Sequence, residues 1–386
     1  MVSQTKEYSI LLKVVEPLIP RGPGEVDPGV RGPHAHGIPL PMPNTTSILG
    51  VLLTGYISKG GKFVGKAKNV EEWYKDFEAT LGLGEGEGAV RGPFIYCLNG
   101  NQEILLVATF EGWVTIDKLY DRLSIILDLI NIGEEHKVSE YLRELTEIYH
   151  EDVLEDRVII SLEDVTKRVR PHYFTLLKLI DYEKILDKLT VKKHIQSEVY
   201  LGIELHKDKF ENIINTLKPP LPVRAFGRSR ISTINIHREA ILMKFLREKM
   251  EKIDKVIGNN TILLYNISPI LLHIGETKDE YLKEELTVVP GLKELYEYIR
   301  GEISKLCKCK KESCVEDLKI YGRVITIGLG YSIRFHERKP LYNALSPGTI
   351  IYAKVRKCNA TPLEVYKEGI GELGHLGFGT IIPLVK

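Results

Sequence analysis

The sequence predicts an α+β fold made of two ferredoxin-like (RRM-like) domains with helical and loop insertions. Three observations predict it. A strand, a helix and a pair of strands follow one another over residues 7–110, the second half again mixes strands and helices without a strict βαβ period, and 386 residues are too many for one compact core. We expect an N-terminal domain at 1–195 and a C-terminal domain at 196–386.

Periodicity and turn signals place the elements of the first half. Apolar residues alternate in a strand at 7–15, and then recur at helical spacing in a helix at 45–57. Pro41 and Pro43 keep this helix from starting earlier. The residues after them that suit an N-cap are Asn44, Thr45 and Thr46. The other elements expected are a helix at 70–81, strands at 93–98 and 103–110 around the hairpin signal Asn99-Gly100, and helices at 116–130 and 137–150.

The second half repeats this alternation around a proline-rich break, Lys218–Pro222. Before the break we expect a strand at 198–206 and a helix at 208–217. After it we expect a basic loop, a strand at 231–236, a helix at 238–257, strands at 261–267, 318–329 and 349–355, a helix at 291–306, and a strand-like run at 380–385.

Composition describes an ordinary globular protein with 43% hydrophobic and 27% charged residues. No apolar run is long enough to span a membrane and no signal peptide is visible, so we expect a cytoplasmic protein. The net charge of +1 is low for a nucleic-acid binder, although a balanced total can hide a basic face. Glutamine is scarce while Lys, Glu and Ile are abundant, which is typical of thermophiles.

Five cysteines are too few for a secreted disulfide framework. Cys307, Cys309 and Cys314 lie close together and could supply three zinc thiolates, with Cys358 or a histidine as a fourth ligand. Zinc sites usually contain Cys-x-x-Cys pairs, which this segment lacks. We therefore expect a solvated, Lys-rich loop and no metal, with a thermophile's local disulfide as the remaining alternative.

A glycine-rich loop at 369–379 is the strongest local signal for function. Its five glycines allow backbone N–H groups to approach a phosphate, although a tight surface turn would use the same residues. Glu372 inside it would be unfavourable beside a phosphate unless it points outward. The candidate RNA-binding residues of this loop are Gly369, Gly371, Gly374, His375, Gly377, Phe378 and Gly379.

Two basic loops are further candidates for RNA binding. Long loops without secondary structure are often functional, and their arginines can pair bidentately with phosphates beside glycines that let the backbone approach. The first loop contributes Arg21, Gly22, Gly24, Arg31, His34 and His36. In the second loop an aromatic ring among arginines offers a stacking surface for unpaired bases, and the residues are Arg224, Phe226, Arg228 and Arg230.

Motifs for nucleotide cofactors are missing. Residues 60–66 lack the spacing of a phosphate-binding P-loop, and the glycine-rich segment at 82–88 follows a helix and carries two glutamates, so we interpret it as a flexible acidic linker. We predict no catalytic residue, no metal and no cofactor.

The chain resembles the RAMP proteins of CRISPR systems, and among them the third-subunit family of type III-B (Cmr) effector complexes. The resemblance rests on Glu16-Pro-Leu18, the segment 21–28, the proline-bounded start of the first helix, Tyr200–Leu205, Leu345–Tyr352 and the terminal glycine-rich loop. These segments are spread over the whole chain, so the resemblance is full-length.

The resemblance implies a RAMP-type fold and a non-catalytic, structural subunit of an interference complex. Such a subunit would bind the 5′ handle of the guide RNA (crRNA) and contact the large polymerase-like subunit and other RAMP subunits. Base pairing would then supply sequence recognition.

Two other functions remain open. RAMP proteins that process guide RNA often use a histidine as general acid or base, so His34 or His36 would make the chain a metal-independent endoribonuclease. A scaffold that contacts only protein is the third hypothesis, and the near-zero net charge is its best argument.

Overall fold

The computed structural model describes residues 7–18, 40–63, 65, 67–83, 89–162, 169–189, 197–206, 210–225, 230–250, 255–258, 260–272, 292–309, 314–328, 331–332, 337–338 and 341–385. Within these ranges, no helix is both long and apolar enough to cross a membrane.

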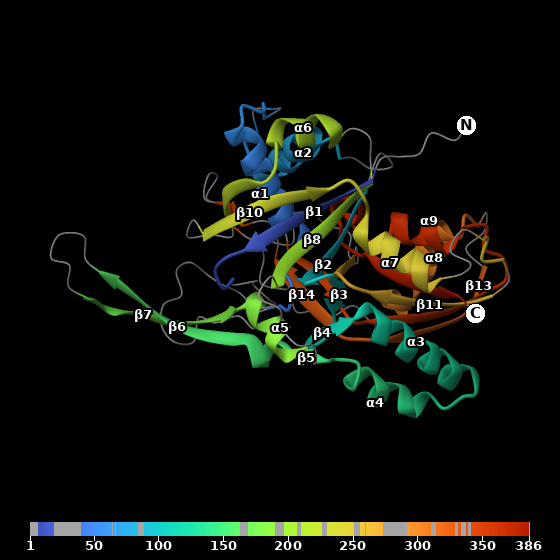
Figure 1. Ribbon diagram of the computed structural model, residues 1–386. Coiled ribbons are helices and arrows are strands. Elements are labelled where there is room, and N and C mark those ends of the chain that lie inside the picture. The colour runs from blue at the N-terminus through green and yellow to red at the C-terminus, as the bar shows by residue number, and fades with distance from the viewer. Residues whose placement is uncertain are drawn as a thin grey trace.

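The larger sheet contains one complete βαββαβ unit (Figure 1). Its four strands are antiparallel and lie side by side in the order β2, β8, β1, β10. A helix, α1 (Thr45–Ser58), connects β1 to β2, and α6 (Glu211–Leu217) leads toward β10. The strands are β1 (Glu7–Val14), β2 (Ala89–Asn99), β8 (Ser197–His206) and β10 (Arg230–His237). This connectivity and strand order are those of a ferredoxin-like unit.

A second βαββαβ unit follows along the chain. Its strands are again antiparallel, in the order β13, β18, β11, β19, with α8 (Leu292–Leu306) and α9 (Pro362–Glu368) as the two crossover helices. The strands are β11 (Thr261–Asn266), β13 (Val315–Tyr321), β18 (Ile350–Val355) and β19 (Ile381–Val385). The predicted α+β fold of two ferredoxin-like halves is thereby confirmed.

The first unit continues past the predicted boundary at residue 195. The strands β8 and β10 lie after that position in the sequence and pair with β1. Further strands widen the sheet on both sides: β3 (Gln102–Ala108), β4 (Gly112–Thr115) and β5 (Ile148–Tyr149) on one side, and β9 (Leu221–Ala225) on the other. The exact division into domains stays a prediction, but β8, β9 and β10 share a sheet with β1.

Both units carry additional strands and helices as insertions. The long hairpin of β6 (Leu154–Leu162) and β7 (Val169–Ile180) projects away from the body (Figure 1). The other helices are α2 (Val70–Leu81), α3 (Ile116–Asn131), α4 (Val138–Arg143), α5 (Ile185–Lys188) and α7 (Ile241–Lys249). The other strands are β12 (Ile270–Leu272), β14 (Val324–Gly328), β15 (Tyr331–Ser332), β16 (Glu337–Arg338) and β17 (Leu341–Leu345).

Three predicted elements are wrong in extent. The helix expected at 137–150 ends as α4 at Arg143, because the chain then turns to add β5 to the sheet. The helix expected at 238–257 is the shorter α7, whose first N–H is bonded to the Ser9 hydroxyl. The strand expected at 318–329 is two strands, β13 and β14, in different sheets.

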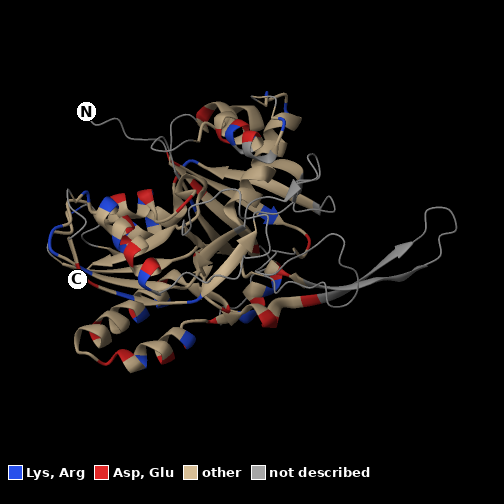
Figure 2. Ribbon diagram, turned by 180° about the vertical axis from the view of Figure 1, so that it is seen from behind, with Lys and Arg blue, Asp and Glu red and all other residues tan. Residues whose placement is uncertain are grey.

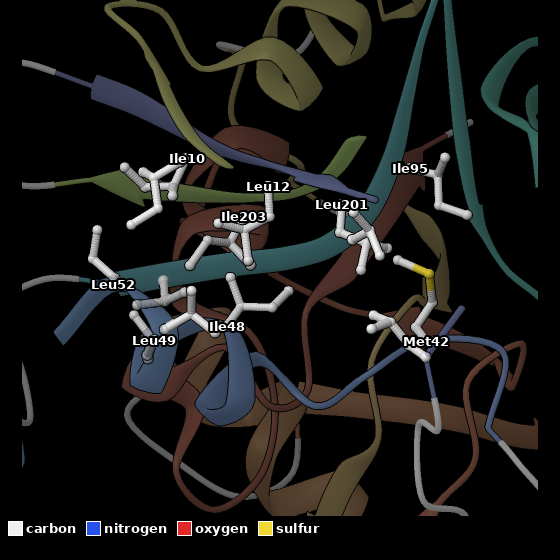
Figure 3. Close-up of a cluster of buried hydrophobic side chains, with 14 of the residues drawn as sticks. Ile10, Leu12, Met42, Ile48, Leu49, Leu52, Ile95, Leu201 and Ile203 are labelled. Carbon is white, nitrogen blue, oxygen red and sulfur yellow. The ribbon is translucent and has the colours of Figure 1, made fainter. Parts of the chain in front are cut away.

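The core of the first unit lies between its sheet and α1 (Figure 3). Ile48 and Leu52 on α1 lie against Ile10 of β1 and Ile203 of β8, and all four side chains are fully buried. Burying each such side chain stabilises the fold by about 1.5–3 kcal/mol. Apolar periodicity in α1 was thus a reliable guide to packing.

The opposite face of the same sheet is covered by α3, α7 and the sheet of the second unit. Phe94 of β2 and Tyr265 of β11 belong to this shared core, and the Tyr265 hydroxyl donates a 2.7 Å hydrogen bond to the carbonyl of Ala108. The two units are therefore fused through one apolar core and do not sit side by side as separate globules.

The clustered cysteines form disulfides. Cys307 bonds to Cys358, and Cys309 bonds to Cys314. The favoured prediction of a solvated loop is wrong here, because the Cys307 and Cys358 side chains are buried and the first bridge ties the end of α8 to the segment before α9. Among the described residues no group of His, Cys, Asp or Glu is arranged to hold a metal ion.

Candidate nucleic-acid interface

The glycine-rich loop leaves α9 and returns to β19 through the junction of the two units. The helix starts with a capping box in which Thr361 and Glu364 bond each other's backbone N–H groups, at 3.2 and 2.8 Å. It stops at Gly369, whose φ of 68° favours glycine. These local signals fix where the loop begins.

Close packing against protein explains the glycines of the loop. A Cβ on Gly377 would stand 2.8 Å from Thr45 Cγ2 at the start of α1, and one on Gly379 would stand 1.6 Å from the carbonyl oxygen of Ile370. Both have positive φ, 89° and 59°. Leu376 and Phe378 alternate with them and are fully buried in the core of the first unit. The loop is thus an inserted segment rather than the tight surface turn considered as the alternative.

A buried arginine fixes the loop to strand β2. Arg91 donates hydrogen bonds to the carbonyl oxygens of Tyr366 and Gly374, each at 2.7 Å, and to that of Lys367. The guanidinium therefore satisfies orphan carbonyls at the end of α9 and one inside the loop. Burial lowers the pKa of Arg91 to about 10, which still leaves it charged at neutral pH.

Further polar groups join the units beside Arg91. The buried Glu204 carboxylate accepts bonds from the Tyr366 hydroxyl at 2.6 Å and the Met243 N–H at 3.0 Å. His206 lies 3.2 Å from Glu204 and 3.5 Å from Glu7, the latter an ion-pair rather than a hydrogen-bond distance. Burial acts to lower the pKa of His206, but these two carboxylates raise it overall. Sequence patterns gave no sign of this network, because its residues come from distant segments.

The N-terminus of α1 meets the loop at Gly377. Asn44 occupies the predicted N-cap position, but its side chain makes no capping bond. Among the described residues, Asn44 Oδ1 and Thr45 Oγ1 are buried and have no hydrogen-bond partner. Such groups are rare and call for a hydrogen-bond partner, and the N-terminus of a 14-residue helix carries the positive end of its dipole. A phosphate could accept a hydrogen bond from the Thr45 hydroxyl, and a ribose hydroxyl could donate one to Asn44 Oδ1.

The structure places only part of the predicted site. The candidates that lie outside the described residues are Arg21, Gly22, Gly24, Arg31, His34, His36, Phe226 and Arg228. Arg224 and Arg230 are in strands, opposite Ile231 and Ala225 in the β9–β10 hairpin. The segment expected as a basic loop after the proline break is therefore largely paired backbone.

The ends of the described segments show where the predicted basic loops are anchored. Val14 pairs with Ser232, so the end of β1 that leads toward 19–39 lies beside the start of β10. After residues 19–39 the chain leads into α1, whose first residue, Thr45, lies next to Gly377 of the glycine-rich loop. All three predicted RNA-binding segments are thus attached to elements that contact one another.

The charge around the loop is mixed. His375 Nε2 lies 2.9 Å from Glu78 Oε1 of α2, so this predicted RNA contact already has a protein partner. Lys and Arg alternate with Asp and Glu along the helices visible in Figure 2, in keeping with the net charge of +1. Electrostatic attraction at this surface must come from local groups and not from an overall basic charge.

Comparison with known proteins supports the same family. No family model matches the chain. The CRISPR system CMR subunit Cmr3 of Saccharolobus solfataricus is 22% identical over 383 residues, which span 98% of this chain and 96% of the relative. The chain is thus similar to Cmr3 over almost its full length. This confirms the resemblance seen in the sequence.

Two solved structures show the same fold as this Cmr3-like chain. They are cryo-EM structures of the type III-B Cmr-beta bound to cognate target RNA, one of them also with AMPPnP in state 1. Each contains a chain with a TM-score of 0.51 to this one, at 21% and 20% identity, and the match covers 89% of this chain and 86% of that chain.

Proposed function

We propose that this chain is a non-catalytic, RNA-binding structural subunit of a type III-B CRISPR complex, and that it holds the 5′ handle of the crRNA. The observation that carries the proposal is the contact between the glycine-rich loop and the N-terminus of α1, where Asn44 and Thr45 have buried polar atoms without a partner in the part of the chain that the structure describes. The full-length similarity to Cmr3 supports it.

The geometry suits backbone recognition of a short single strand. A helix N-terminus attracts phosphate without regard to sequence, and the arginines predicted to flank it add charge-assisted hydrogen bonds. Guide sequences differ, whereas a handle is constant, so a subunit of this kind needs shape and backbone contacts more than base-specific ones.

The proposed function involves protein partners and no catalytic activity. We expect contacts with the large polymerase-like subunit and with other RAMP subunits, in the cytoplasm, and no cleavage of RNA. The predicted histidines His34 and His36 would then serve as polar RNA contacts.

An RNA-binding and cleavage assay tests this function. The full chain, alone and with its large-subunit partner, is incubated in EDTA with crRNA that carries or lacks the handle, and one gel reports retention and product length. We expect intact, handle-dependent retention. Arg21→Ala should weaken it, while Arg238→Ala, which removes an exposed arginine at the opposite end of β10, should not.

A glycine pair provides the second comparison. Gly377→Ala should weaken RNA retention, because the added Cβ would collide with Thr45 at the start of α1. Gly50→Ala is the control. Gly50 lies within α1, a Cβ there meets no atom within 4 Å, and RNA retention should be unchanged. A cut in the repeat that disappears in His34→Ala or His36→Ala would instead make the chain an endoribonuclease. Stable pairing with the large subunit and no RNA retention would make it a protein-only scaffold.

A further inference from the structure

A cleft opens where the two ferredoxin-like units meet, away from the glycine-rich loop. It has a volume of about 350 Å3. The turn between β3 and β4, the helix α4 and the turn between β13 and β14 line it. The lining residues that matter here are Phe110, Glu111, Ser139, Arg143, Tyr321 and Arg323. This volume lies at the lower end of small-ligand sites.

An aromatic ring and a guanidinium lie close together in the lining of the cleft. The guanidinium carbon of Arg323 lies 5.3 Å from the centroid of the Phe110 ring. Arg323 is also 3.5 Å from a carboxylate oxygen of Glu111, and its side chain is still 62% exposed. The carboxylate thus orients the guanidinium while most of the side chain remains exposed. Guanidinium planes and aromatic rings are the two surfaces on which unpaired bases stack.

A second arginine, Arg143, also lines the cleft. Arg143 is the last residue of α4 and is exposed, and no carboxylate of the described residues pairs with it. The neighbouring Arg122 differs, because it lies 3.4 Å from Glu144 and 5.5 Å from the Tyr141 ring centroid. Arg143 therefore remains available to an anionic group bound in the cleft.

A third side chain of the cleft, Tyr321, is oriented by a hydrogen bond. The Tyr321 hydroxyl donates a 3.1 Å hydrogen bond to Glu135, which also pairs with Lys319. This bond fixes the orientation of a half-buried ring at the edge of the cleft. The cleft is thus lined by two aromatic rings, by a guanidinium that Glu111 orients, and by Arg143, which has no carboxylate partner among the described residues.

We infer that this cleft binds one unpaired nucleotide of single-stranded RNA. The base lies against Phe110 and Arg323, and Arg143 takes the adjoining phosphate. Glu111 and the Ser139 hydroxyl offer acceptors for amino groups at a base edge. An acidic peptide fits less well, because its acidic side chains offer no flat ring to lie against Phe110 and Arg323. The inference rests on the proposed RNA-binding function and adds a second contact, in a different part of the molecule.

Photo-crosslinking with the full chain tests the inference. The probe is a single-stranded, handle-bearing RNA substituted with 4-thiouridine, and mass spectrometry identifies the crosslinked peptides while a titration gives the affinity. We expect a crosslink to a peptide that contains Phe110 or Tyr321. Phe110→Ala should weaken binding about tenfold, in the range measured for lost base stacking.

Two arginine variants keep the test independent of folding. Arg143→Ala removes an exposed side chain and should weaken binding several-fold. Arg122→Ala removes the same charge from the neighbouring helix outside the cleft and should change affinity less than about twofold.

The outcomes separate this inference from the proposed function. If RNA is retained but crosslinks elsewhere, and Arg143→Ala behaves like Arg122→Ala, the cleft site is wrong and the RNA-binding function stands. If no RNA is retained even with the partner subunit, both fail. If the cleft variants disturb only association with another subunit, the cleft is a protein contact and the inference is overturned.

Discussion

Arg91 shows how one side chain can hold two distant parts of the chain together. Arg91→Ala would leave the carbonyls of Tyr366, Lys367 and Gly374 without a donor in a buried site. We expect a loss of about 3–5 kcal/mol in the free energy of unfolding, measured by urea denaturation. Arg122→Ala, which breaks only a partly exposed ion pair, should cost no more than about 1 kcal/mol. Equal losses would contradict the assigned role.

Glu7 makes the free energy of unfolding depend on pH. Burial acts to raise its pKa, but His206 and Lys367 together lower it to about 2, against 4.5 for a free glutamate. A lowered pKa in the folded state stabilises the protein above pH 4.5, and this stability disappears as the pH falls toward 2. Glu7→Gln should therefore cost on the order of 2–3 kcal/mol near pH 6 and almost nothing near pH 2. A pH series of unfolding curves, with Glu144→Gln as control, measures it.

At the scale of single elements, two glycines respond in opposite ways to the same substitution. Gly301 lies inside α8, and a Cβ there meets no atom within 4 Å. Gly301→Ala should stabilise the protein by about 0.5–1 kcal/mol, because alanine loses less conformational entropy in a helix. Gly377→Ala should destabilise it, since φ is 89° and Thr45 blocks the Cβ. Thermal unfolding of both variants decides, and a gain at Gly377 would refute the packing argument.

Elements with strong local signals were predictable from the sequence, and those defined by distant contacts were not. The helix at 70–81 was predicted to the residue, and Asn99-Gly100 marks the observed hairpin. The strand β9 was missed because its pairing with β10 follows a proline-rich break, and α4 was overextended because β5 depends on the neighbouring strand β4. Glycine content located the candidate site, whereas Arg91 and Glu204 become visible only once β2, β8 and α9 are assembled.

On the scale of the whole molecule, the shared core predicts one cooperative unfolding transition. Phe94 and Tyr265 come from different units but belong to the same cluster. Both tryptophans, Trp73 and Trp113, lie in the first unit and report its unfolding by fluorescence, while hydrogen exchange in β18 reports the second. We expect the two midpoints in urea to coincide. Separate midpoints would mean that the units are independent domains.

The position of Leu376 and Phe378 also sets the order in which this protein can mature during translation. Both side chains fill a core that β1 and α1 begin to build, yet they lie near the end of the second unit, between α9 and β19. A ribosome therefore releases β1 and α1 long before the side chains that complete their packing. Until then the nascent first unit exposes an apolar gap, which is the kind of surface that chaperones recognise.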